Sequence, residues 1–313
     1  MFDPLRECVC GEFILPLDRH YGYFLFTIAG SFYNVPKNKR SILSAKGGII
    51  LFKAQNYIKA SDLQEALELN KKRTNKVLGG GCWMKMGKKN INTLIDLSGL
   101  GLDKITETDD EITIGAMVTL RDIETNPVIE KYFGNYFKDA FTHIVGVQFR
   151  NCATIGGSVF SRFGFSDIVT SLIVLGTEVE LAGGETVSMK EYSERDYDNN
   201  IVVNIHIKKD GRKAAYESFR NTQTDIPVLN CSLAYDGKKL YAAVGARPMR
   251  GNVSTMDCPD VENSEEIFKF FEKIQAETEF ETNTRASKEY RKHLCLVLLK
   301  RAYKKLVCKE GEQ

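Results

Sequence analysis

A glycine-rich turn followed by a carboxylate is the part of this sequence best suited to chemistry. Residues 154–158 read Thr-Ile-Gly-Gly-Ser, and Ser166-Asp167 opens an apolar run that Gly176 ends. Glycines let a ligand approach backbone N–H groups, and Ser166 is a good N-cap for a helix with Asp167 in its first turn. The pattern predicts a nucleotide cradle, in which N–H groups bind phosphate oxygens and the carboxylate binds sugar hydroxyls.

A second glycine-rich turn, residues 79–81, follows a predicted strand at 76–78. Three glycines directly after a strand suit a close approach to a pyrophosphate, although a tight structural turn is equally typical. The run is not the dinucleotide fingerprint Gly-x-Gly-x-x-Gly, which opens a long helix in a βαβ unit. Here a strand is expected soon afterwards, at 93–97.

Composition and charge favour an ordinary globular protein. The chain has 313 residues, a formal net charge of +2, 27% charged and 43% hydrophobic residues, which does not suggest a nucleic-acid binder. Basic residues near the C-terminus accompany an apolar stripe and are interpreted as a solvated helix face.

The spacing of the cysteines and histidines does not indicate a metal site. The eight cysteines form no Cys-x-x-Cys pair, which argues against a zinc ribbon or a cysteine-held iron–sulfur cluster. Their scatter is typical of reduced thiols in the cytoplasm. The four histidines show no ligand spacing, and His143 is interpreted as a structural residue rather than a base. We therefore predict no metal site.

The remaining pattern predicts an α+β protein that changes character near residue 200. A capping box at Ser61–Gln64 starts a helix, and another helix is expected over 128–145. Gly183-Gly184 predicts a hairpin. An antiparallel sheet then follows, covered on one face by two helices. Its strands are expected at 201–207, 216–220, 228–235 and 240–246, and the helices at about 263–275 and 287–307.

Residues 1–50 are predicted to be an N-terminal extension, and we hypothesise that they are not part of the natural protein. The aromatic stretch 21–33 is too short to span a bilayer, which needs about 20 apolar residues, and it does not fit a signal peptide. Lys46-Gly47-Gly48 can be encoded by a bacterial ribosome-binding sequence, with a start codon at Leu51. Other codons in the genomic DNA would contradict this hypothesis.

From Phe52 to about Val307 the sequence resembles the FAD-binding subunit of molybdenum hydroxylases, the group of xanthine dehydrogenase and carbon monoxide dehydrogenase. Six segments carry the resemblance by their order and spacing: 77–82, 150–158, Ser166-Asp167, Asp225-Ile226, 245–250 and 287–294. The resemblance implies a two-lobed FAD-binding domain of the vanillyl-alcohol-oxidase (PCMH) type over 51–208. It also implies a small C-terminal α+β domain of the CO dehydrogenase flavoprotein type over 209–313.

The resemblance also implies a cofactor site. Backbone N–H groups of both glycine turns would bind the FAD diphosphate, Asp167 would bind ribityl or ribose hydroxyls, and two further positions would line the flavin and adenosine. The predicted residues are Val77, Leu78, Gly79, Gly80, Gly81, Cys82, Trp83, Met84, Ile144, Thr154, Ile155, Gly156, Gly157, Ser158, Asp167 and Val202. No catalytic residue is assigned.

Three positions depart from the family pattern. Ser158 replaces the usual Asn, Thr170 replaces the usual Pro, and Glu217 stands where several relatives carry Lys near the flavin. The first two are expected to be tolerated. A carboxylate at 217 is expected to change the charge beside the cofactor, which puts an NAD site in more doubt than the FAD site.

The function implied is that of an FAD-dependent electron-transfer subunit in the cytoplasm, without a membrane span. Substrate would be oxidised on a molybdopterin-binding large subunit, and electrons would pass through [2Fe–2S] clusters of a small subunit to FAD and on to NAD or another acceptor. The chain alone would not hydroxylate a substrate. Two alternatives stay open: a self-contained flavin reductase or oxidase, such as the enolpyruvoyl-UDP-sugar reductases, and an FAD-less scaffold.

Overall fold

The computed structural model describes residues 12–13, 26–27, 53–87, 89–258 and 260–307. The chain divides into two units, residues 1–49 and 50–313. In the first unit, β1 (Glu12–Phe13) pairs antiparallel with β2 (Phe26–Thr27). The hypothesis about residues 1–50 otherwise concerns positions outside the described residues.

The first lobe of the second unit is a small parallel sheet. Its strands are β3 (Lys53–Lys59), β4 (Lys76–Leu78) and β5 (Asn90–Asp96), in the order β3-β5-β4. Helix α1 (Leu63–Asn70) lies between β3 and β4 in the chain, and such a crossover lets both strands pair parallel with β5, which lies between them. Its N-cap is Asp62, which accepts a hydrogen bond from Glu65 N at 2.8 Å, so the predicted cap at Ser61 is one residue early.

The second lobe is an antiparallel sheet covered by short helices. The strand order is β6-β7-β10-β8-β9, and β8 pairs with β9 in the predicted hairpin. The strands are β6 (Ile105–Glu107), β7 (Glu111–Gly115), β8 (Glu178–Leu181), β9 (Thr186–Ser188) and β10 (Val202–Lys208). The helices are α3 (Leu120–Thr125), α4 (Pro127–Phe133), α5 (Tyr136–Phe141), α6 (Val147–Arg150), α7 (Ile155–Ser161), α8 (Asp167–Ile173) and α9 (Met189–Glu194).

The single helix predicted over 128–145 is wrong. Gly134 has φ 53° and ends α4, so α5 starts in a new direction. The aromatic spacing was nevertheless informative, because Phe137 and Phe141 are buried and their rings meet edge to face at 5.6 Å.

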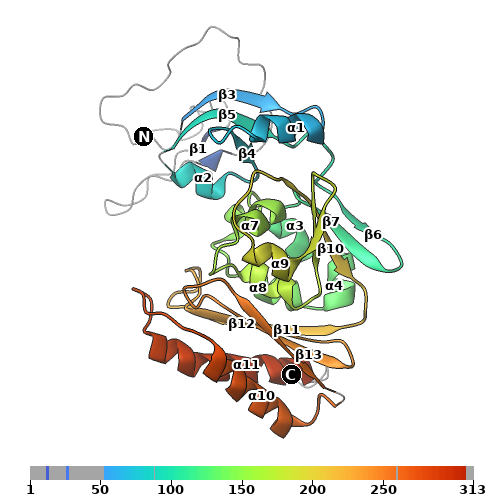
Figure 1. Cartoon of the computed structure of the whole chain (residues 1–313), viewed down its shortest axis with the longest axis vertical. Coiled ribbons are helices and arrows are strands. Elements are labelled where there is room, and N and C mark those ends of the chain that lie inside the picture. The colour runs from blue at the N-terminus through green and yellow to red at the C-terminus, as the bar shows by residue number, and fades with distance from the viewer. Residues whose placement is uncertain (1–11, 14–25, 28–52, 88, 259, 308–313) are drawn as a thin grey trace, which may run out of the picture. The chain divides into compact units, whose positions relative to one another are not determined.

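The C-terminal region is a four-stranded antiparallel sheet with two helices. It contains β11 (Lys213–Phe219), β12 (Leu229–Tyr235), β13 (Lys239–Gly245) and β14 (Asn252–Asp257), followed by α10 (Ser264–Glu277) and α11 (Lys288–Val307). The two helices pack on one face of this sheet, as predicted, while the other face meets α5 and α8 of the second lobe (Figure 1). Helix α8 therefore lies between two sheets.

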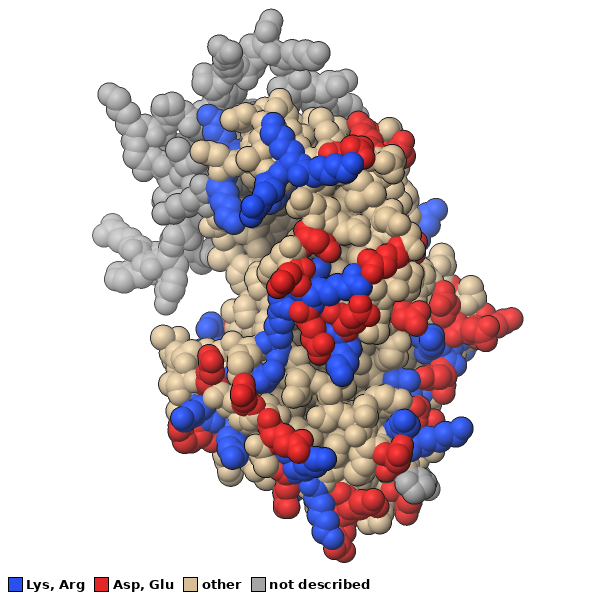
Figure 2. Space-filling model, in the orientation of Figure 1, with Lys and Arg blue, Asp and Glu red and all other residues tan. Residues whose placement is uncertain are grey.

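Charges are mixed on the surface. Figure 2 shows Lys and Arg interspersed with Asp and Glu over the face that it displays. In α11, Lys305 contacts Asp139 at 3.0 Å and Glu217 at 2.8 Å, so this part of the basic helix pairs with acidic neighbours. Among the described residues, no helix is both long and apolar enough to cross a bilayer.

Candidate functional site

A cavity of about 390 Å³ opens between the first lobe, the second lobe and the segment 224–227, within the usual range for small-molecule sites. Both glycine turns reach it. The predicted residues that line it are Val77, Gly79, Gly80, Gly81, Cys82, Trp83, Met84, Ile144, Thr154, Gly156, Gly157, Ser158, Asp167 and Val202. The structure thus brings together residues from distant parts of the chain.

Two predicted residues do not line the cavity. Ile155 is fully buried in the hydrophobic core of the second lobe. Leu78 supports the turn from behind, since its Cδ1 lies 3.4 Å from where a Cβ on Gly81 would be. Both are therefore packing residues.

The first glycine turn keeps its backbone free for a ligand. A Cβ on Gly80 would lie 1.8 Å from the carbonyl oxygen of Cys152, and one on Gly79 would lie 2.8 Å from Thr154 Oγ1. The two glycine turns are thus in contact. Among the described residues, no acceptor takes the N–H groups of Gly79, Gly80 or Gly81. These donors suit phosphate oxygens.

The second glycine turn uses its backbone N–H groups within the chain. Ile155 N donates to Val118 O at 2.9 Å and Gly156 N to Ala116 O at 2.9 Å. Gly157 N donates to Thr154 Oγ1 at 3.3 Å, and Ser158 N to Thr154 O at 3.1 Å. These four N–H groups thus have acceptors within the chain, and their binding of a diphosphate stays a prediction.

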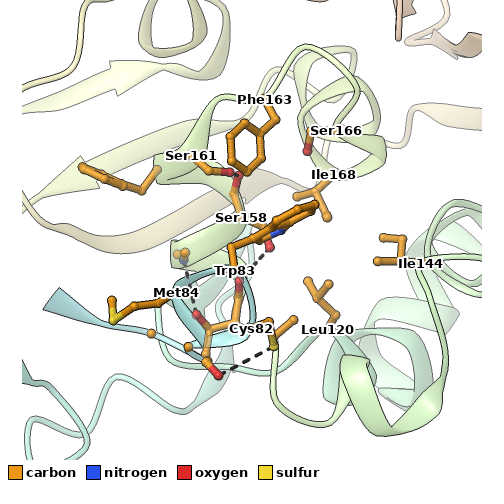
Figure 3. A pocket seen from close by; sticks show the side chains of 18 of the residues that line it. Cys82, Trp83, Met84, Leu120, Ile144, Ser158, Ser161, Phe163, Ser166 and Ile168 are labelled. Atoms are coloured by element: carbon orange, nitrogen blue, oxygen red, sulfur yellow. Dashed lines mark hydrogen bonds between the residues drawn. The ribbon is translucent and has the colours of Figure 1, made fainter. Parts of the chain in front are cut away.

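The second turn contributes close packing and hydroxyl groups. A Cβ on Gly156 would lie 2.5 Å from Ala116 Cβ, so glycine is needed there to seat α7. The Ser158 hydroxyl lines the cavity and donates to Thr154 O at 2.9 Å, which leaves its oxygen able to accept (Figure 3). Ser158 in place of Asn thus retains a polar group at the cavity.

Three aromatic side chains form a wall of the cavity. Trp83 is 48% exposed and meets Phe163 edge to face at 5.5 Å, while Phe163 stacks on Phe165 at 5.0 Å. Figure 3 shows Trp83 and Phe163 side by side. Such a surface suits a planar ring. Phe163 and Phe165 were not predicted, although the aromatic-rich run 160–165 between two helices was a usable signal.

Asp167 lies in the first turn of α8, as predicted, with Ser166 as N-cap accepting from Val169 N at 3.1 Å. Its Oδ1 accepts hydrogen bonds from the Tyr216 hydroxyl and, at 3.1 Å, from Asn230 Nδ2. Burial and the charge of Asp167 raise the pKa of Tyr216 well above its usual value. Within the described part of the chain, Oδ2 has no hydrogen-bond partner, so this oxygen is available to a ligand.

The other two departures from the family pattern are now explained. Thr170 donates from Oγ1 to Ser166 O at 3.0 Å inside α8, so the helix accommodates it. Glu217 does not line the cavity. Because side chains alternate along a strand, Tyr216 points to Asp167 while Glu217 binds Lys305 at 2.8 Å. The expected change of charge beside the cofactor is therefore not found at 217.

The segment 224–227, which sequence reasoning did not assign to the site, is held by three arginines. Arg220 Nη1 donates to Asp225 O at 2.5 Å, and Arg285 Nη2 pairs with Asp225 Oδ1 at 2.9 Å. Arg291 donates from Nε to Val228 O at 2.9 Å. Asp225-Ile226 and 287–294 carried the resemblance, and the structure shows that both serve to position this cavity wall.

Metal ligation has no counterpart in the described residues, among which no group of three or more His, Cys, Asp or Glu is placed to hold an ion. His143 lines the cavity.

Comparison with known families identifies the class of protein. Residues 52–208 match the family described as the FAD binding domain in molybdopterin dehydrogenase. The chain belongs to this family, and the predicted relation to FAD-binding subunits of molybdenum hydroxylases is confirmed.

Individual relatives are distant in sequence and similar in fold. The uncharacterized protein YgfM of Escherichia coli K12 is 23% identical over 193 residues, which covers 59% of this chain and 73% of YgfM. A chain of carbon monoxide dehydrogenase from Hydrogenophaga pseudoflava superposes with a TM-score of 0.70 at 20% identity, covering 80% of this chain and 96% of that one. A chain of quinoline 2-oxidoreductase from Pseudomonas putida 86 superposes with a TM-score of 0.66 at 17% identity, covering 82% of this chain and 95% of that one. These likenesses confirm the predicted α+β fold.

Proposed function

We propose that this chain is the FAD-binding electron-transfer subunit of a multi-subunit molybdenum hydroxylase resembling xanthine dehydrogenase. A partner small subunit with [2Fe–2S] clusters would deliver electrons that a molybdopterin-binding large subunit takes from substrate. The location proposed is the cytoplasm. The observation that carries the proposal is the cavity itself, whose free N–H groups at Gly79–Gly81 lie within the segment that matches the FAD-binding family.

The residues present fit FAD. Gly79–Gly81 would bind diphosphate oxygens, and Asp167 Oδ2 and Ser158 Oγ would bind hydroxyl groups. The Trp83–Phe163 wall would cover a planar ring. When bound, FAD supplies the electron-accepting chemistry, and the protein contributes binding, orientation and exclusion of water. No acid or base residue is needed for this role.

The acceptor beyond FAD is proposed to be NAD or another soluble oxidant. Glu217 faces Lys305 and lies away from the cavity, which removes the main objection that the sequence raised against a pyridine nucleotide. The likeness to xanthine dehydrogenase in particular rests on the sequence segments described above.

Purification of the chain with its co-expressed neighbours tests this proposal. We expect yellow protein with one FAD per chain and co-elution with two subunits that contain molybdopterin and iron. Colourless protein that does not bind added FAD would favour the alternative of an FAD-less scaffold. Yellow protein that elutes alone and is reduced directly by a pyridine nucleotide would favour a self-contained reductase.

A further inference from the structure

Arg220 reaches the cavity from the C-terminal end of β11, outside the segment that matches the FAD-binding family. Its side chain is only 6% exposed. Nη1 donates to Asp225 O at 2.5 Å, and Nη2 lies 2.7 Å from Asp167 Oδ1 as an ion pair. Nε has no hydrogen-bond partner among the described residues, and Nη2 has only Asp167 Oδ1 beside it.

A buried guanidinium with an unsatisfied donor destabilises the fold unless a ligand accepts that hydrogen bond. A guanidinium carries five N–H donors in a fixed fork, and a buried donor without an acceptor costs about 1–3 kcal/mol. Its ion-pair partner is incomplete as well, because Asp167 Oδ2 has no partner within the described part of the chain. The pair therefore offers the cavity donors from Arg220 beside an acceptor from Asp167.

We propose that Arg220 is a direct ligand of the flavin nucleotide, donating from Nε and Nη2 to one of its acceptor oxygens. This inference rests on the proposed function, since it requires a flavin nucleotide in the cavity. It assigns a charged cofactor ligand to the C-terminal region. Glu217, three residues earlier in the chain, faces the opposite side of the sheet and pairs with Lys305. The acceptor is a phosphate, a ribityl hydroxyl or a ring carbonyl, and all three share the same chemistry.

Titration of the FAD-free full-length chain with FAD, followed by flavin fluorescence, tests the assignment. Arg220→Met is expected to weaken FAD binding at least tenfold, and Arg220→Gln, which keeps a hydrogen-bond donor, to weaken it less. Arg212→Met is the matched control, because Arg212 is also buried and ion-paired, with Asp210 at 2.6 Å, but does not line this cavity. We expect its FAD affinity to stay within about threefold of wild type.

Titrations with FMN and ADP locate the acceptor. If the Arg220 variants lose binding of FMN but not of ADP, the acceptor of Arg220 lies on the ribityl or ring portion. If they lose binding of ADP, the acceptor lies on the diphosphate. If wild type binds FAD and both Arg220 variants bind it equally well, the inference is overturned while the proposed function stands. If Arg220→Met does not fold, Arg220→Gln decides by the same criterion. Wild type that binds no flavin nucleotide overturns both.

Discussion

Asp167 and Arg220 join two parts of the fold, with Oδ1 and Nη2 only 2.7 Å apart. Asp167 starts α8 in the second lobe, and Arg220 follows β11 of the C-terminal sheet. Both side chains are almost fully buried. Removing one partner of such a pair leaves an uncompensated buried charge, which is strongly destabilising.

Asp167→Ala is therefore expected to lower the free energy of unfolding by about 3–5 kcal/mol, measured by urea denaturation without flavin. Loss of a sugar ligand would add a decrease in FAD affinity on the order of 1–3 kcal/mol. Glu265→Ala serves as control, because the Lys269–Glu265 pair is exposed and such pairs contribute about 0–1 kcal/mol. A loss below 1 kcal/mol for Asp167→Ala would contradict the role of this pair.

Gly80→Ala is expected to abolish FAD binding, because the new Cβ would lie 1.8 Å from Cys152 O and force the two glycine turns apart. Gly183→Ala is the matched control. Its Cβ would meet only Asn200 Nδ2, at an ordinary 3.6 Å, and its FAD affinity is expected to equal that of wild type. FAD retention after gel filtration measures both, and a yellow Gly80→Ala protein would show that the turns do not need this contact.

Val145→Gly is expected to stabilise the protein by about 1 kcal/mol. Val145 has φ 52° and is 49% exposed, and a left-handed non-glycine residue stores about 1–3 kcal/mol of strain, of which glycine's flexibility offsets roughly 0.5–1. Val147→Gly is the control, since its φ is not positive and only the entropic loss remains. Thermal unfolding should move the two variants in opposite directions, and a decrease for both would argue against strain at Val145.

Alkylation of Cys82 by iodoacetamide is expected to be slow near neutral pH and to accelerate up to about pH 11. Burial, followed by the charge of nearby Cys152, raises the pKa of the Cys82 thiol to about 11. Because only the thiolate reacts, a raised pKa shifts the whole rate profile to higher pH than for a free cysteine, whose pKa is about 8.5. Peptide mass spectrometry follows the site, and a rate that levels off near pH 8.5 would refute this environment.

Local signals in the sequence predicted much of the site. Ser166 as N-cap, Asp167 in the first turn and the glycines after β4 all depend on neighbours within a few residues, which a sequence pattern contains. Strands β11, β12 and β13 of the C-terminal sheet were predicted for the same reason. Placing the strand at 201–207 in that sheet was wrong, because β10 pairs with β7 and β8 of the second lobe. Strands β3, β6 and β14 were not predicted, and they lie at the edges of their sheets.

Long-range partners were the part that sequence reasoning could not supply. Nothing near Asp167 shows that Tyr216, Arg220 and Asn230 meet its carboxylate. Asn230 was the one available signal, because a polar residue inside the apolar strand β12 must be satisfied when buried. The acceptors of the N–H groups of 155–158 could not be foreseen for a similar reason, since they come from residues 116 and 118 as well as from Thr154.

All seven residues of α8 are buried, because the helix is covered by the second lobe on one side and by the C-terminal sheet on the other. The family match ends at residue 208, yet a protein cut there would expose the inner surface of this helix to water. Residue 208 thus marks the end of the matched domain, whereas the packing around α8 continues into the C-terminal sheet. Binding of a flavin nucleotide by Asp167 would therefore depend on the folding of both the second lobe and the C-terminal sheet.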